Sequence, residues 1–326
     1  MKNILVTGWA GYIGSHTVRE LNKQWYNSII FDNLELWHQE SIIWNEIFVG
    51  DLRNIQDLEA AFEKYTIDAV IHFAAYASVP DSVDHPDKYY INNLTWGLNL
   101  LNTMNKFGVK KIIFSSSASV YWEPESEIIT ESHPKNPTNP YWHSKLLFEQ
   151  ILHWYHVAYN ISSISFRYFC ASWASSDWSI WELHTPETHV IPCAILASLG
   201  KRDSFIVFGD DYPTPDGTGI RDFIHVEDLA TAHVLWLSQL DNGICEQCNL
   251  GIWKWFSVKE IIGAVERVSG KKFPYVVAPR RKWDPSILIA DNKKAIELLS
   301  WRPKYTSIDD IVRTAFIFLQ SHHESH

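Results

Sequence analysis

Short apolar runs alternate with longer amphipathic segments over the first half of the chain. Strands are predicted at 4–6, 28–32, 46–49, 68–73 and 111–115. Helices are predicted between them, one ending near residue 21 and others over 55–64, 86–107 and 141–159. Strands that are apolar on both faces need helices on both sides, so this alternation predicts an α/β fold with a doubly wound parallel sheet.

The regular alternation ends after about residue 167. Residues 170–221 are rich in Ser, Pro, Asp and Gly and predict loops with one helix near 190–200, and a further helix begins at 224–228 and runs to about 239. Residues 245–326 mix short strands and helices. We therefore expect a first domain over 1–168, to which 222–247 returns, and a smaller mixed α/β lobe formed by 169–221 and 248–326.

Charge and composition narrow the range of partners. The formal net charge is −10 and no basic block is present, which argues against a nucleic acid or an anionic membrane as partner. No stretch reaches the roughly 18 apolar residues of a membrane span, and the N-terminus does not resemble a signal peptide. Of four cysteines only Cys245 and Cys248 have ligand-like spacing, so we expect a reduced, cytoplasmic protein without a metal site.

A glycine motif follows the first predicted strand and opens the first helix. Gly8, Gly11 and Gly14 have the spacing that lets a backbone turn approach a pyrophosphate and aim helix N–H groups at it. Asp32 ends the next strand, where an acid can bond ribose hydroxyls and would repel a 2′-phosphate. The motif predicts a Rossmann-type sheet that binds NAD, although the same spacing also occurs in plain glycine turns.

Tyr141 and Lys145 lie four residues apart on a predicted helix, so both side chains share one face. A nearby ammonium would lower the pKa of the tyrosine and favour its phenolate as a base. This spacing is common by chance, but Ser117 ends a predicted strand at the sheet edge where ligands bind. Together the three residues predict a proton-transfer site.

Two arginine clusters lie in the second half of the chain. Arg221 follows a glycine-rich loop, and Arg280 and Arg281 follow Pro279. Guanidinium groups bind phosphate oxygens in a planar fork, which suits a nucleoside diphosphate. Solvated surface arginines would explain either cluster taken alone.

With these motifs the chain resembles the UDP-glucose 4-epimerases, which are extended short-chain dehydrogenases, along nearly its whole length. Matching segments include 6–16, 32–34, 50–53, 70–75, 113–121, 139–141, 144–145, 167–169 and 278–281 with Asp284. The most specific match runs from Phe208 to Thr218 and on into Arg221, Asp222, His225 and Val226.

The resemblance implies that the first domain binds NAD and the smaller lobe binds a UDP-sugar. Tyr141 would take the proton of the 4-hydroxyl, hydride would pass from C4 to NAD+, and the 4-keto sugar would turn over before the hydride returns. Catalysis is then assigned to Tyr141, Lys145 and Ser117. The implied NAD contacts are Gly8, Gly11, Tyr12, Ile13, Gly14, Asp32, Asn33, Asp51, Leu52, Phe73, Ala74, Ala75, Asn92, Ser115, Tyr141, Lys145 and Tyr168. The implied substrate contacts are Ser117, Tyr141, Cys170, His189, Arg221, Arg281 and Asp284. A homodimer is the assembly that the resemblance suggests.

Three positions bear on specificity. Related dehydratases carry an Asp-Glu pair just after the serine, and related decarboxylases a Glu one residue further on, whereas this chain has Ala118 and Ser119. This difference disfavours those reactions. Leu288 lies where some members carry a bulky tyrosine, so we hypothesise that N-acetylated sugars also enter the pocket.

The tryptophan content departs from the family pattern. Only 14 of 326 residues are glycine, about 4%, where roughly 7% is usual, and 16 are tryptophan. Twelve tryptophans stand where the family usually has glycine: Trp9, Trp25, Trp37, Trp96, Trp122, Trp142, Trp173, Trp178, Trp181, Trp253, Trp255 and Trp283. A UGA codon that is read as glycine in the source but written as tryptophan would produce this pattern. Codons other than UGA at these positions would exclude that explanation.

Two alternatives to an active epimerase stay open. If the tryptophans are real, Trp9 in the glycine turn and Trp142 beside Tyr141 favour a catalytically impaired UDP-sugar binder. A different nucleotide-sugar epimerase or dehydratase on the same fold is the other alternative. Cys170 and His189 stand where the family usually has Asn at substrate-contacting positions, so their contribution here is unassigned.

Overall fold

The computed structural model describes most of the chain. The described residues are 1–9, 11–35, 46–121, 126–172, 175, 177, 187–239, 243–281 and 284–321. Trp37, Trp122, Trp173, Trp178, Trp181 and Trp283 lie outside them.

A seven-stranded sheet in the order β12-β7-β5-β4-β1-β2-β3 forms the larger part of the molecule. All of its neighbouring strands pair in parallel. The strands are β1 (Asn3–Thr7), β2 (Asn27–Asp32), β3 (Glu46–Val49), β4 (Ala69–His72), β5 (Lys111–Ser117), β7 (Ser162–Tyr168) and β12 (Cys245–Leu250). The predicted doubly wound, Rossmann-type sheet is therefore confirmed, with β1 flanked by β2 and β4 where the strand order reverses.

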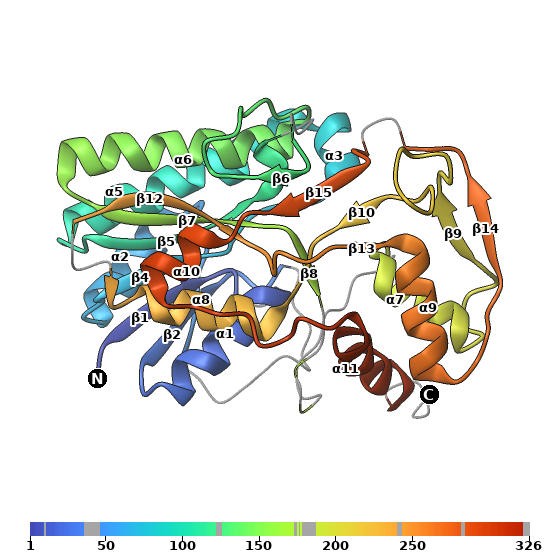
Figure 1. The fold of residues 1–326 in the computed structure, drawn as a ribbon. Coiled ribbons are helices and arrows are strands. Elements are labelled where there is room, and N and C mark those ends of the chain that lie inside the picture. Colours follow the sequence, from blue (N-terminus) through green and yellow to red (C-terminus); the bar gives the residue numbers. More distant parts are fainter. Residues whose placement is uncertain are drawn as a thin grey trace.

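Helices cover both faces of this sheet, as apolar strands require. On one face lie α2 (Ile55–Lys64), α5 (Trp96–Lys106) and α6 (Pro140–Tyr159). On the other lie α1 (Tyr12–Lys23), α8 (Val226–Trp236) and α10 (Lys293–Leu299) (Figure 1). Successive side chains of β1 point to opposite faces of the sheet. Ile4 and Val6 therefore belong to the core beside α1, and Leu5 belongs to the core beside α5.

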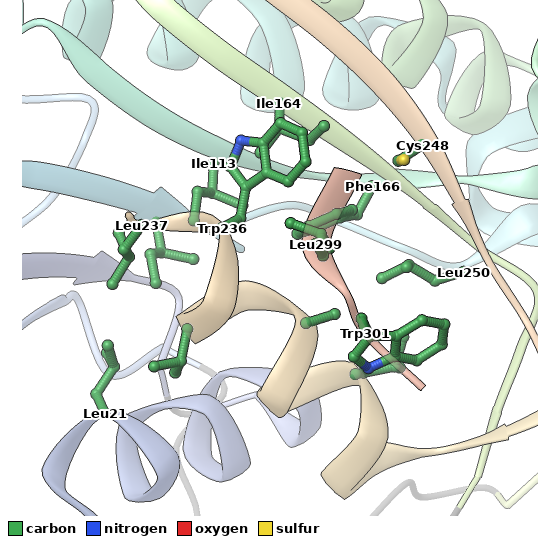
Figure 2. Close-up of a cluster of buried hydrophobic side chains, with 14 of the residues drawn as sticks. Leu21, Ile113, Ile164, Phe166, Trp236, Leu237, Cys248, Leu250, Leu299 and Trp301 are labelled. Carbon is green, nitrogen blue, oxygen red and sulfur yellow. The ribbon is translucent and has the colours of Figure 1, made fainter. Parts of the chain in front are cut away.

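The core beside α1 and α8 contains two large indoles. Figure 2 shows the rings of Trp236 and Trp301 in this cluster, with Trp236 beside Ile113 and Ile164 of the sheet. Trp301 donates its indole N–H to the Asp228 carbonyl at 3.1 Å. The indole of Trp301, which is not among the twelve tryptophans at family glycine positions, is both buried and hydrogen-bonded.

The predicted helix over 86–107 is present in the structure and contains a π-helical turn. It consists of α4 (Pro86–Tyr90), a π-helical turn (Ile91–Thr95) and α5, and the short helix α3 (Val79–Asp84) precedes them. Such π-turns insert an extra residue into the helical repeat and recur at functional sites.

A smaller assembly of strands and helices lies beyond the end of the sheet (Figure 1). A mixed sheet has the order β13-β10-β15-β6, and β8 pairs with β11 and β9 with β14. The strands are β6 (Ile128–Ile129), β8 (Cys170–Ser172), β9 (Phe205–Phe208), β10 (Ile220–Arg221), β11 (Phe223–His225), β13 (Phe256–Ser257), β14 (Tyr275–Ala278) and β15 (Ile287–Ala290). The helices are α7 (Val190–Ser198), α9 (Val258–Ser269) and α11 (Ile308–Ser321), which share a separate hydrophobic core.

Two segments depart from the expected division of the chain. β12 pairs with β7 as far as Leu250, and α10 packs into the core under the large sheet. The sequence placed both 248–250 and 293–299 in the smaller lobe, because neither segment carries a motif that marks its partner. The exact division into two domains stays a prediction.

Asp222 joins the smaller lobe to the large sheet. Its fully buried carboxylate accepts the backbone N–H groups of Ile252 at 2.8 Å, Trp253 at 3.1 Å and Ala290 at 3.3 Å. Its own backbone N–H donates to the Leu288 carbonyl, and its carbonyl accepts from the Cys170 N–H. One residue therefore connects β8, β15 and the loop that follows β12.

Two tryptophans lie in backbone conformations that favour glycine. Trp25, just after α1, has φ 60° and Trp253, in the loop after β12, has φ 55°. A left-handed backbone brings Cβ too close to the following carbonyl in every residue except glycine. Both positions agree with the proposal that glycine belongs there.

We expect Trp25→Gly to raise the free energy of unfolding by about 0.5–1 kcal/mol. Glycine removes the left-handed backbone strain, which costs roughly 1–2 kcal/mol in the folded state. It also gives the unfolded chain more conformational entropy, which lowers the stability by about 0.4–1 kcal/mol. Because the Trp25 side chain is 79% exposed, little burial is lost. Urea denaturation measures the change. Ala60→Gly is the control: this exposed residue lies inside α2, so glycine there should destabilise by about 0.5–1 kcal/mol. Equal losses in both variants would contradict the strain argument.

We expect Asp222→Asn to lower the free energy of unfolding by about 1–3 kcal/mol. The amide keeps one acceptor oxygen but turns an N–H group toward buried backbone donors, so at least one of them loses its partner. Chemical denaturation at fixed pH measures the loss. Asp203→Asn, at an exposed aspartate, should stay within about 0.5 kcal/mol of the parent. An unchanged midpoint for Asp222→Asn would show that this carboxylate does not hold the lobes together.

Candidate functional site

The site lies at the carboxyl ends of β1, β4, β5 and β7. In open parallel sheets ligands bind at this edge, next to the point where the strand order reverses. The glycine turn follows β1, Ser117 ends β5, and the helix with Tyr141 and Lys145 lies between β5 and β7 in the chain.

The turn after β1 accepts only glycine at two positions. Gly8 has φ +73°, and a Cβ there would lie 2.4 Å from the Ala74 backbone nitrogen. At Gly14 a Cβ would lie 2.8 Å from the Gly8 carbonyl oxygen. The Phe73 and Ala74 N–H groups both donate to the Thr7 carbonyl, which ties the end of β4 to this turn. Gly8, Gly14, Phe73 and Ala74 are therefore brought together as expected.

Helix α1 begins at this turn. Gly11 is its N-cap residue, has no side chain to bond the first N–H groups, and is followed directly by Tyr12 and Ile13. Its first turn holds no acidic residue. A helix N-terminus with this arrangement attracts an anionic group such as a pyrophosphate.

Polar residues meet at the ends of β2 and β3. Asp32 accepts the Leu34 N–H at 2.9 Å, and Asn33 donates its side-chain amide to the Asp51 carboxylate at 3.0 Å. The Leu52 carbonyl accepts the side-chain amide of Asn99. The acid that the sequence placed at the end of the second strand thus lies at the site edge, beside residues from the next strand.

Lys145, which is buried, and Tyr141, which is partly buried, form a pair on α6. The Lys145 ammonium donates to the Ser115 carbonyl at 2.7 Å and lies 5.9 Å from the centre of the Tyr141 ring. Burial lowers the pKa of Lys145 to about 7. Burial, with a smaller contribution from Tyr89, raises the pKa of Tyr141 to about 12. The sequence led us to expect a lowered tyrosine pKa. In the chain by itself desolvation makes the phenol the favoured form.

Ser117 ends β5 and caps the 3₁₀ turn Ala118–Val120. Its hydroxyl accepts the Ser119 N–H at 3.2 Å, and its backbone lies in register with Tyr168 of β7. The Tyr168 hydroxyl contacts His233 Nε2 at 2.6 Å, so it is held by α8 from below the sheet. Ser115, Ser117 and Tyr168 are therefore neighbours at one strand edge.

The π-helical turn supplies residues that the sequence motifs did not identify. Asn92 donates to the Asn93 side chain at 2.7 Å, and Asn93 donates to the Ser144 hydroxyl at 3.0 Å. Asn93 also bonds both backbone groups of Tyr76. Asn92 was expected at the cofactor, but Asn93 is the buried residue that fixes α6. In the sequence, Ser144 lies between Tyr141 and Lys145. This serine, whose hydroxyl accepts from Asn93, is the feature that could have indicated a buried polar partner for α6.

A second polar group lies in the smaller lobe. Arg221 of β10 contacts the Asp284 carboxylate and donates to the Ile220 carbonyl, while the Arg281 guanidinium lies 3.9 Å from the centre of the Phe208 ring. A cleft of about 550 Å³ lies in the same lobe and is lined by Gly209, Asp210, Asp211, Val277, Ala278, Pro279 and Arg280, but not by Arg221 or Arg281. Guanidinium groups that are already stacked or paired suit a planar base and a diphosphate.

Cys170 and His189 have distinct surroundings. Cys170 lies on β8 and is bonded through its backbone to Asp222, and burial raises the pKa of its thiol to about 11. His189 precedes α7 and contacts the Glu187 carboxylate at 2.9 Å. The thiol is therefore neutral, and neither residue is assigned to substrate by its contacts within the chain.

Tryptophans at the site are accommodated without opening it. Trp9 is completely buried in the core under the glycine turn, and its indole nitrogen has no hydrogen-bond partner among the described residues. Trp142 lies in the first turn of α6, where its backbone N–H is capped by Asn139 at 3.0 Å. The helical backbone at Trp142 does not call for glycine, in contrast to Trp25.

In the part of the chain that the structure describes, no group of three or more His, Cys, Asp or Glu side chains is arranged to hold a metal ion. None of the helices described combines the length and the apolar character needed to cross a bilayer.

Comparison with known proteins agrees with this geometry. The NAD dependent epimerase/dehydratase family matches residues 4–251. The chain belongs to this family. A UDP-glucose 4-epimerase of Lacticaseibacillus casei is 44% identical over 323 residues, covering 98% of both chains.

Two solved structures of relatives contain ligands. UDP-glucose 4-epimerase from Brucella ovis in complex with NAD is 42% identical, covers 98% of both chains and superposes with a TM-score of 0.93. The enzyme from Bifidobacterium longum in complex with NAD+ and UDP is 38% identical, covers all of both chains and has a TM-score of 0.91. The family resemblance drawn from the sequence is thus confirmed over the full length of the chain.

Proposed function

We propose that this protein interconverts UDP-galactose and UDP-glucose by NAD-dependent oxidation and re-reduction at C4 of the sugar. The observation that carries the proposal is the Tyr141–Lys145 pair, which the buried Lys145 anchors to β5 near Ser117, at the same edge of the sheet as the glycine turn. The relatives that match over the full length bear the same activity in their names.

The residues at the turn fit NAD. The Gly8 turn leaves no room for a Cβ, the α1 N-terminus has no acidic side chain in its first turn, and Asp32 stands at the edge where ribose hydroxyls would lie. When bound, NAD+ supplies the hydride acceptor for C4 and the donor for the return. The fully buried indole of Trp9 packs under the turn and does not alter this fit.

Tyr141 holds the reacting proton in the proposed mechanism. As a phenolate it accepts the proton of the 4-hydroxyl, and as a phenol it returns it to the new 4-oxygen. Because burial raises its pKa to about 12, the phenolate needs positive charge nearby. Lys145 would provide one charge from the chain, and a bound oxidised nicotinamide would add another. Ser117 lies on the adjacent strand end and would bond the 4-oxygen.

Arg221, Arg281 and Asp284 would hold the UDP group. Arg221 and Asp284 already contact each other, so the guanidinium is oriented before a diphosphate arrives. Remote binding of the nucleotide leaves the sugar free to turn over between the two hydride transfers, which a pocket built tightly around the sugar would prevent.

The alternatives are less consistent with the site. Elimination of water needs an acid beside Ser117, and the next two residues are Ala118, which is buried, and Ser119. An impaired binder would need the tryptophans to disrupt the turn or the catalytic helix. Instead the Gly8 turn and the α6 N-cap both keep their hydrogen bonds.

We expect the purified protein to convert UDP-galactose to UDP-glucose, and Tyr141→Phe to lower kcat about 10²–10⁴-fold. The phenyl ring keeps the packing against Tyr89 but cannot exchange a proton. A coupled UDP-glucose assay measures turnover, and calorimetry with UDP measures binding, which the variant should retain. UDP binding by the parent without any turnover would select the impaired binder instead, and a dehydrated product would select a dehydratase.

We also propose that N-acetylated UDP-sugars enter the pocket. Leu288 is partly buried against the cluster around Ala118 and is smaller than the tyrosine found there in some family members. Turnover of UDP-N-acetylglucosamine should therefore be detectable, and Leu288→Tyr should reduce it more than turnover of UDP-galactose. No turnover of the N-acetylated sugar by the parent would remove this proposal.

A homodimer in the cytoplasm is the assembly and compartment that we propose. α6 exposes Trp154 and Val157 on one face, 66% and 61% accessible, and such apolar surface commonly marks a contact between subunits. The described cysteines are all free, as expected in a reducing compartment. Light scattering that gave a monomer mass would contradict the dimer.

A further inference from the structure

Lys145 is buried among few compensating charges. Its side chain is among the most buried polar groups of the protein, and its ammonium has the Ser115 carbonyl at 2.7 Å and the Phe114 ring at 4.9 Å. A buried ammonium tends to lose its proton unless an opposite charge lies nearby. The proposed reaction needs it charged.

Glu149 lies one helical turn further along α6, four residues from Lys145. Side chains at this spacing are neighbours on one helix face. Glu149 is 4% exposed and is the residue whose negative charge raises the pKa of Lys145 against the effect of burial. No other Asp or Glu contributes to that balance among the described residues.

The Glu149 carboxylate is also bonded to the catalytic strand. Oε1 accepts the Ser116 hydroxyl at 2.6 Å and Arg167 Nε at 3.0 Å, and Oε2 accepts Arg167 Nη2 at 2.5 Å. Ser116 stands between Ser115, which holds Lys145, and Ser117, which faces the substrate. α6 and β5 are therefore joined twice, once by Lys145 and once by Glu149.

The other groups around Lys145 do not replace this charge. Burial lowers the pKa of His72 to about 3, so it is neutral, and the tyrosines are phenols in the chain alone. Arg167 is positive and is itself paired with Glu149. The groups facing Lys145 are Tyr141 and Glu149 from α6, His72 from β4, and Phe114 and Ser115 from β5.

We propose that Glu149 is a positioning residue for catalysis, which keeps Lys145 charged and holds the end of β5 against α6 so that Ser117, Tyr141 and Lys145 stay aligned. This inference rests on the proposed function for its catalytic consequence. The effect of Glu149 on the charge of Lys145 does not depend on the proposed function. Without Glu149, Lys145 and Arg167 would be two buried cations with no counter-charge, and the lysine is the one that can lose its proton.

Glu149→Gln separates charge from shape. The amide retains the size of the side chain and one oxygen for Ser116, but it carries no charge. We expect the pKa of Lys145, followed by NMR of ¹³C-labelled lysine in the holoenzyme, to fall by about one pH unit. Lys145→Arg identifies the signal. The limb of the pH–kcat profile that reports loss of the lysine proton should move to lower pH by a similar amount, with KM for UDP-galactose changing much less.

Two matched variants exclude a purely structural role. Ser116→Ala removes a hydrogen bond of Glu149 but keeps its charge, so it should lower stability without moving the Lys145 titration. Glu149→Asp keeps the charge on a shorter side chain and should restore the titration at least partly.

Opposite results overturn the inference in identifiable ways. A Lys145 titration that is the same in Glu149→Gln and the parent would disprove the electrostatic role, whether or not the protein turns over UDP-galactose. If the Lys145 titration moved as far in Ser116→Ala as in Glu149→Gln, the shift would come from disturbed packing and not from the lost charge of Glu149. A shifted titration in a protein without epimerase activity would instead uphold the inference and remove the proposed function.

Discussion

Asp222 is the interaction on which the arrangement of the two parts of the molecule depends. Its carboxylate bonds three backbone N–H groups from segments that are 30 and 68 residues away in sequence. Gly251 is required beside it, since a Cβ there would lie 2.5 Å from the Asp222 Oδ2. Burial raises the pKa of this carboxyl to about 7, and the three donors oppose that rise. Arg221 on one side and Cys170 on the other are placed by the same residue, so the join between the lobes is also part of the substrate side of the site.

Desolvation dominates the chemistry of the catalytic helix. It moves Tyr141 and Lys145 toward their neutral forms, which is opposite to what the proposed proton transfer needs. Two ordered groups favour the charged form of Lys145: the Ser115 carbonyl, which accepts from the ammonium, and the Glu149 carboxylate one helical turn away. The site therefore works through charges that balance one another inside the protein, and removing one of them changes the protonation of the others.

The tryptophans show how backbone conformation and side-chain identity can disagree. Trp25 and Trp253 adopt left-handed backbones, whereas Trp142 lies in a helix and Trp9 fills a core. The family pattern marked all four as glycine positions, but only the first two have a conformation that favours glycine. Restoring glycine should therefore affect stability unequally among them.

Local patterns in the sequence determined the parallel sheet, the glycine turn, the helix that carries Tyr141 and Lys145, and the family. Each depends on residues close together in the chain: apolar strands, the spacing of Gly8, Gly11 and Gly14, and a four-residue helical repeat. The tertiary structure alone decided what those residues touch. It paired Glu149 with Arg167 and Ser116, placed a π-helical turn at Ile91–Thr95 within the predicted helix, carried β12 to Leu250 and raised the pKa of Tyr141 instead of lowering it. Burial and long-range hydrogen bonds produce these features, and neither is encoded in the spacing of nearby residues.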